Sequence, residues 1–121
     1  MTVHCLFHDY ADYECSAETL IGIYLTQGDA ETGLLEIVAR GEKLAAEDRA
    51  FTERFQECHR LHRNEKPAVG LINRYQQALQ VIIDEQKAWR QANFGCDWND
   101  IPDADINSYH IEEIEVGKIR S

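Results

Sequence analysis

The chain has 121 residues, the usual size of one domain, and a formal net charge of −10, which argues against direct binding of nucleic acid. Its 44% hydrophobic content is ordinary for a globular protein, and no segment approaches the roughly 20 apolar residues of a membrane span. The first residues lack the basic and apolar regions of a signal peptide, so we expect a cytoplasmic protein with reduced cysteines.

Two segments near the N-terminus are rich in apolar residues. Residues 2–7 are predicted to form a short strand, because apolar side chains alternate with others. Residues 17–26 carry conflicting signals. Ser16 in front of them is a good helix N-cap, whereas their β-branched residues favour a strand. We predict a short helix here and keep a strand as the alternative.

Two long amphipathic helices are predicted, over residues 30–62 and 68–93. In both segments, residues of one seam recur at alternating three- and four-residue steps. The short connection between them predicts an antiparallel hairpin. A turn centred in this connection would place Gly41 opposite Trp89, so that a small residue faces the largest one.

The C-terminal part combines turns with a strand. Residues 94–108 are turn-rich and acidic, and 109–119 alternate in part between apolar and acidic side chains. Two terminal strands can pair with each other or with a partner chain. We therefore predict a single domain over residues 1–121 that is mainly α, with α+β character at the termini. It would hold a long antiparallel helical hairpin at 30–93, one further short helix, and a small β element from the N- and C-terminal strands.

The acidic residues concentrate in the segments that flank this hairpin, 1–29 and 94–121. Residues 1–39 hold seven acids and no lysine or arginine, and 91–117 also hold seven acids and no base. Residues 40–90, in contrast, hold eight acids and ten bases. Such segregation informs about partners more than about fold. We expect a non-enzymatic protein-interaction module of the inhibitor or immunity-protein kind, which binds a basic protein surface through its acidic terminal segments.

The candidate partner-binding residues are acids and aromatic residues of the flanking segments. Acids steer a basic partner toward the surface, and aromatic side chains anchor it. These residues are Asp97, Trp98, Asp100, Asp103, Asp105, Tyr109, Glu113, Glu115, Tyr10 and Tyr13.

No catalytic motif is present, neither a nucleophile elbow nor a glycine-rich phosphate loop, so we predict no enzymatic activity and no cofactor. The first alternative is a small zinc-binding regulatory domain. Cys58 and His62 stand four apart on a predicted helix, and Cys5 and His8 lie three apart, which together would give a Cys2His2 set. The paired knuckles of zinc sites are missing, however, and Cys58 and His62 also fit the apolar seam of the helix.

A structural helical oligomer is the second alternative. Two helices alone leave apolar side chains beside their seam, and a second copy of the chain could cover them. We therefore expect a homodimer or an obligate partner.

Overall fold

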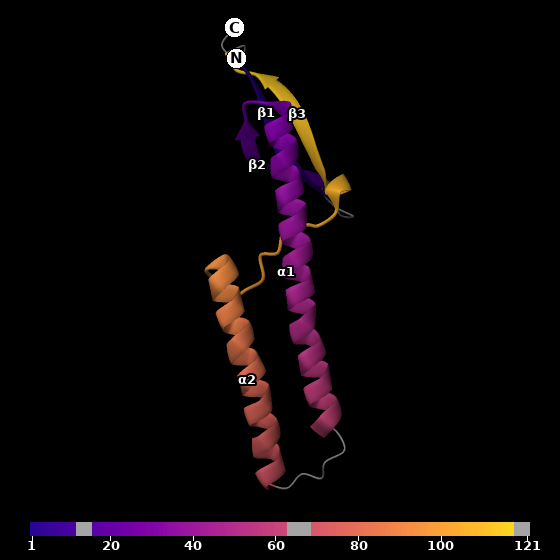
Figure 1. The fold of residues 1–121 in the computed structure, drawn as a ribbon, viewed down its shortest axis with the longest axis vertical. Coiled ribbons are helices and arrows are strands. Elements are labelled where there is room, and N and C mark those ends of the chain that lie inside the picture. Colours follow the sequence, from indigo (N-terminus) through magenta and orange to yellow (C-terminus); the bar gives the residue numbers. More distant parts are fainter. Residues whose placement is uncertain (12–15, 63–68, 118–121) are drawn as a thin grey trace. The chain divides into compact units, whose positions relative to one another are not determined.

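The computed structural model describes residues 1–11, 16–62 and 69–117 (Figure 1). The elements are the strands β1 (Thr2–Ala11), β2 (Ser16–Tyr24) and β3 (Tyr109–Glu115), the helices α1 (Gln27–His62) and α2 (Val69–Phe94), and the 3-10 turn η1 (Ile106–Ser108). They form two compact units. The sheet unit comprises Met1–Glu42 and Pro102–Ser121, and the helical unit comprises Lys43–Ile101. None of the helices in the described ranges is long and apolar enough to span a membrane.

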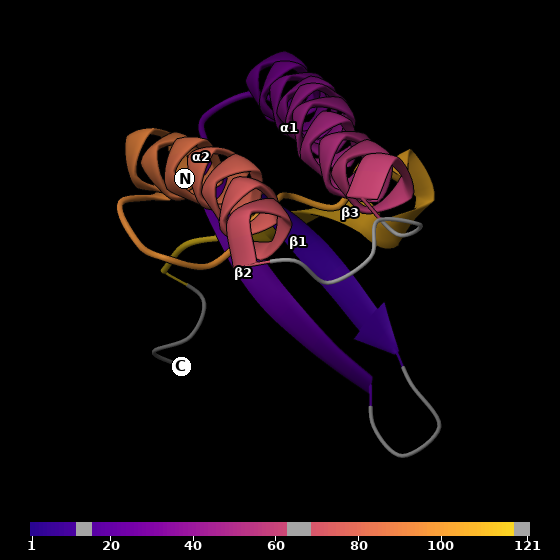
Figure 2. The same cartoon turned by 90° about the horizontal axis from the view of Figure 1, so that it is seen from below.

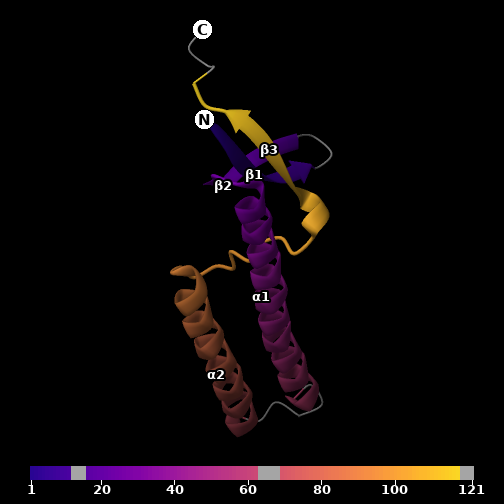
Figure 3. The ribbon, with the colours of Figure 1, turned by 45° about the horizontal axis from the view of Figure 1, so that its top comes forward.

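The three strands form an antiparallel sheet in the order β2-β1-β3, so that β1 lies in the middle (Figure 3). Along the β1–β3 ladder, Val3 lies opposite Ile114 and His8 lies opposite Tyr109. The backbone N–H of Val116 donates to the carbonyl of Met1 at 2.7 Å and extends this ladder. The pairing of the two ends of the chain, which the sequence suggested, is thus present.

Residues 16–24 form a strand, and the predicted short helix over 17–26 is wrong. The β-branched and aromatic residues of this segment fit a pleated surface, and β1 offers a backbone partner along its length (Figure 2). Ser16, the expected helix cap, lies opposite Ala11 instead. Tertiary pairing with β1 therefore outweighs the local capping signal.

The β1–β2 ladder contains a bulge. Leu6 lies opposite Gly22, but the next residue, Phe7, lies opposite Leu20. Ile21 is therefore the extra residue on β2 that has no partner on β1.

The first turns of α1 pack on one face of the sheet. Tyr24 lies opposite His4, so its side chain shares the face of Leu6, which is fully buried. The Tyr24 hydroxyl sits so close to Gly33 of α1 that an added Cβ would overlap it. Thr26 caps this helix, because its hydroxyl accepts the backbone N–H of Asp29 at 3.1 Å.

Gly41 is the second-last residue of α1 in the sheet unit, and it lies against the carbonyl oxygen of Pro102. The predicted pairing of Gly41 with Trp89 is wrong. Trp89 contacts Phe51 with 5.6 Å between ring centroids, and its indole N–H donates to Glu47 at 3.2 Å. Gly41 makes room for the segment that returns toward β3. Helix periodicity does not reveal this contact.

In the helical unit, α2 lies beside the second part of α1 (Figures 1 and 3). Cys58 of α1 and Ile82 of α2 are buried, and Arg54 forms an ion pair with Glu85. Arg54, Cys58 and Ile82 line an open groove of about 550 Å³. Leu61 lines the groove and is exposed over 57% of its surface.

The predicted fold class is therefore wrong. The chain is not mainly α with a dominant helical hairpin and a further short helix; it has two helices and a three-stranded antiparallel sheet. The helices themselves begin and end within a few residues of the predicted ranges. The error lies in the predicted packing partner of α1. The hairpin prediction paired the whole of this helix with α2, whereas its first part, Gln27–Glu42, belongs to the sheet unit.

Candidate functional site

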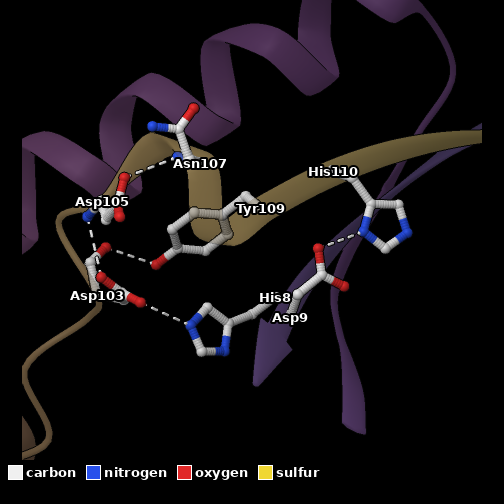
Figure 4. Close-up of polar contacts among 7 residues, drawn as sticks. All are labelled: His8, Asp9, Asp103, Asp105, Asn107, Tyr109 and His110. Carbon is white, nitrogen blue, oxygen red and sulfur yellow. Dashed lines mark hydrogen bonds and ion pairs between the residues drawn. The ribbon is translucent and has the colours of Figure 1, made fainter. Parts of the chain in front are cut away.

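β1 contributes to two histidine–carboxylate pairs, one on each face of the sheet, whose partners come from the segment before η1 and from β3 (Figure 4). Neighbouring residues of a strand point to opposite faces, so His8 and Asp9 of β1 project in opposite directions. His8 pairs with Asp103, and Asp9 pairs with His110.

The first pair belongs to a connected turn. His8 Nε2 lies 3.0 Å from Asp103 Oδ2, and the hydroxyl of Tyr109 donates to the Asp103 carbonyl at 2.7 Å. The other carboxylate oxygen of Asp103 accepts the backbone N–H of Asp105 at 2.9 Å. Asp105 in turn accepts the N–H of Asn107 at 3.0 Å and caps η1 (Figure 4). These contacts satisfy the polar groups locally, as in a structural turn.

The second pair lies on the opposite face, where residues from all three strands come together. Asp9 and Glu18 are direct partners on β1 and β2, and His110 of β3 lies opposite Phe7. His110 Nδ1 is 2.7 Å from Asp9 Oδ2, and its Nε2 is 3.9 Å from Glu18 Oε1. The ring of Phe7 stacks on the imidazole at 5.1 Å, with the planes 16° apart, and so sets the plane of the imidazole ring. We call Asp9, Glu18 and His110 the three-strand cluster.

The two networks shift the affinities of their groups for protons. The Asp9 carboxylate raises the pKa of His110, and the charges of Glu18 and Glu112 add to this effect, while burial opposes it. The pKa of Asp103 is lowered, first by the backbone N–H of Asp105 and then by His8. Burial raises the pKa of Tyr109, and the neighbouring Asp103 adds to this rise.

The residues predicted to bind a partner lie in different surroundings. Tyr109 is only 8% exposed and bonded to Asp103, so it is part of the core. Asp103 and Asp105 are exposed but serve the turn at η1. Among the others in the sheet unit, Glu113 and Glu115 are exposed on β3 and Tyr10 is exposed on β1, and Tyr13 lies outside the described residues.

Three predicted partner-binding residues follow α2 in the helical unit. Asp97 accepts a hydrogen bond from Gln91 at 2.6 Å, and its carbonyl lies 3.4 Å from Arg90 Nη1. Trp98 is 68% exposed, and Asp100 is exposed as well. These residues are available to solvent at the end of the helical unit.

The predicted zinc residues do not gather into a site in the part of the chain that is described. Cys5 is buried, and His8, three residues later on the same strand, projects from the opposite face. Cys58 is buried in the helical unit, and the side chain of His62 is outside the described part. Among the described residues, the three-strand cluster is the only place where three metal-ligating side chains bring their ligand atoms within 4.8 Å of one another.

Sequence reasoning missed this cluster. Asp9 and Glu18 are nine residues apart, and His110 is about 90 residues further on. Only the strand register unites them, and that register was out of reach once residues 17–26 were predicted as a helix. Assigning the segment as the second strand of a hairpin would have brought Asp9 and Glu18 together.

The two units differ in charge. Residues 1–42 and 102–121 hold 13 acids and three bases, whereas 43–101 hold nine of each. The net charge of −10 is therefore that of the sheet unit, since the helical unit is neutral. Comparison of the chain with protein-family models, curated proteins and solved structures finds no match to any of them.

Proposed function

We propose that the protein is a non-enzymatic interaction module whose sheet unit binds a basic surface on another protein. The observation that carries this proposal is the placement of the whole net charge on one of two compact units. A field of one sign accelerates and orients encounter with a partner of the opposite sign, whereas scattered charge mainly supports solubility. An inhibitor or immunity protein would use such a field.

β3 supports the proposal because it presents carboxylates along an outer strand of the described sheet. Glu113 and Glu115 are exposed on it, and Arg40 is the only lysine or arginine in residues 1–42 and 102–117. The strand therefore adds exposed negative charge to a unit whose described part is poor in lysine and arginine.

Exposed apolar and aromatic side chains of the same unit can serve as anchors. Tyr10 on β1 is 52% exposed, and Val116, directly after β3, is 47% exposed. Aromatic anchors contribute much of the binding energy of protein interfaces, while surrounding charges mainly set the association rate and the choice of partner.

The proposal is tested by capture from a cell extract at low and high salt, with the full chain immobilised. The binding variant is Glu113→Lys combined with Glu115→Lys. The matched control is Glu53→Lys combined with Glu57→Lys, which makes the same change of charge on α1 in the helical unit. We expect a basic protein that the wild type and the control retain at low salt and that the binding variant loses.

The captured protein is then purified and its affinity measured directly as a function of salt. Binding by the sheet unit predicts an affinity that weakens steeply as salt screens the charges. The proposal fails if no protein depends on Glu113 and Glu115, or if the affinity of the purified pair does not change with salt.

A second candidate, the structural oligomer, is favoured by the groove of the helical unit. Leu61 lines the groove, and Val81 and Ile83 of α2 are also exposed, at 54% and 43%. Because the helical unit is neutral, two copies can approach one another there without a net repulsion between these units. We propose that a second copy of the chain covers this groove.

Light scattering coupled to size exclusion tests the second candidate. The wild type is expected at the mass of a dimer, and Leu61→Glu is expected at the mass of a monomer because it places a charge in the apolar contact. The Leu35→Glu variant, which changes an exposed leucine of the sheet unit, is the control and should stay dimeric. A monomeric wild type at micromolar concentration would exclude this candidate.

A further inference from the structure

We propose that the three-strand cluster of Asp9, Glu18 and His110 binds a divalent first-row transition-metal ion, such as Mn²⁺ or Zn²⁺. The inference is independent of the basic partner proposed above. It rests on the register of the sheet, the geometry of the three side chains, and the chemistry of their donor atoms.

The register sets two carboxylates against each other. Asp9 and Glu18 are direct partners in the β1–β2 ladder, so both side chains project from the same face at the closest cross-strand spacing. Like charges in this position destabilise a sheet. A cation between the two carboxylates would turn this repulsion into attraction for both of them.

Lysine and arginine do not supply that cation from the surrounding segments. None occurs in residues 1–39 or 91–117, which contain all three strands of the sheet. Beside the two carboxylates, a proton on His110 or a bound ion can supply the positive charge. An imidazole without the extra proton offers a nitrogen lone pair instead, and two carboxylates beside it complete a set of metal ligands.

The geometry brings the donors close to a common point. One ligand atom from each of the three residues lies within 4.8 Å of the others. Ligands held at about 2.0–2.2 Å from one ion stand roughly 3–3.5 Å apart, so a small rotation of the carboxylates closes the set. Solvent leaves room for this rotation, because the side chains of Asp9 and Glu18 are 43% and 56% exposed, and an ion would replace the 2.7 Å contact between Asp9 and His110.

The imidazole is the fixed member of the set. Phe7 stacks on the ring, and the side chain of His110 is 32% exposed, less than either carboxylate. The three residues of the cluster come from three different strands. An ion bound here would therefore link β2 and β3 to the central strand. One imidazole nitrogen with two carboxylate oxygens suits Mn²⁺, Fe²⁺ and Zn²⁺, and water fills the remaining positions.

Titration calorimetry with MnCl₂ tests the inference on the full chain without an affinity tag. Mn²⁺ is the first probe because it prefers oxygen and imidazole ligands to the thiols of the free cysteines. We expect one ion per chain for the wild type. Glu18→Gln should weaken the affinity by at least about tenfold, the effect of disturbing a metal site.

Glu113→Gln is the matched control. It removes the same charge from the same sheet, but Glu113 lies opposite His4 and therefore projects from the face away from the cluster. Its affinity should stay within about twofold of the wild type, since only the general field of the unit changes. Equal losses in Glu18→Gln and Glu113→Gln would overturn the site and leave diffuse attraction of the ion to an acidic surface.

Nuclear magnetic resonance of the wild type gives a readout that does not depend on any variant. Mn²⁺ is paramagnetic and broadens the signals of the nuclei nearest to it. The imidazole signals of His110 should broaden at the lowest Mn²⁺ concentration, before those of His59 in the helical unit. Broadening that begins elsewhere, or that requires a large excess of the ion, would contradict the proposal.

Discussion

Gly41 of α1 lies directly against the carbonyl oxygen of Pro102, with the backbone nitrogen of Ala104 also at the edge of contact. A Cβ at this position would overlap backbone atoms, which cannot turn away as a flexible side chain can. The glycine therefore permits the chain to return along the helix toward β3. Its low helix propensity costs about 1 kcal/mol, and the close approach explains why that cost is tolerated.

Gly41→Ala should destabilise the protein even though alanine is the better helix former. Overpacking against backbone typically costs about 1–3 kcal/mol, which exceeds the gain of about 1 kcal/mol in helix propensity. Urea unfolding followed by circular dichroism measures the change. Gly28→Ala is the control, because no atom lies within 4 Å of the Cβ it would add. It should leave stability unchanged or raise it; equal losses at both positions would disprove the steric argument.

Phe51 and Trp89 should be energetically coupled. Their ring centroids are 5.6 Å apart, and tilted aromatic pairs contribute about 0.5–1.5 kcal/mol beyond the area they bury. A double-mutant cycle with Phe51→Leu and Trp89→Leu measures this term from the free energies of unfolding. The register predicted from sequence would give no coupling between these two positions, and a measured coupling near zero would contradict the contact between the two rings.

Acid should destabilise the turn at Asp103. The backbone N–H of Asp105 and the side chain of His8 hold the pKa of Asp103 below its ordinary value of 3.8. A lowered pKa stabilises the fold above the ordinary value, and the contribution is lost as the pH falls through the lowered one. Asp103→Asn should therefore flatten the dependence of the melting temperature on pH below about 4. Asp100→Asn, outside this turn, should keep the wild-type dependence; identical profiles for both variants would rule this cause out.

Glu18→Gln should stabilise the metal-free protein when His110 is neutral. The change removes one of two directly opposed carboxylates, a relation that costs roughly 0.2–1 kcal/mol across a sheet. The free energy of unfolding at pH 8, with a chelator present, tests this expectation. As His110 becomes protonated at lower pH, its charge compensates the carboxylates and the gain should shrink. A loss of stability at pH 8 would mean that Glu18 is already compensated.

The sequence indicated those elements whose signals are local. The long helices follow from seam periodicity and end at His62 and Phe94, and β1 and β3 follow from alternating side chains at the two ends. The assignment of 16–24 failed because Ser16 mimics a helix cap, while the competing signal depends on a strand that precedes it. Local propensity cannot weigh that pairing.

The candidate cluster could not be predicted from motifs. Its three residues come from three strands, and no spacing along the chain relates His110 to Asp9. The contacts of Gly41 and Trp89 were equally hidden, because helix periodicity gives the seam of a helix but not the segment that lies against it. Residue composition did locate the acidity at the termini, and the folded sheet unit gathers it into one body.

The bulge at Ile21 decides which residues face each other at the far end of the hairpin. If the pairing of His4 with Tyr24 continued without the extra residue, Asp9 would lie opposite Thr19 and Glu18 opposite Tyr10. A single inserted isoleucine thus exchanges a neutral hydroxyl for a second carboxylate across from Asp9. The backbone register thus determines that Asp9 and Glu18 face each other. A shift of one residue would separate the two carboxylates without any change of sequence.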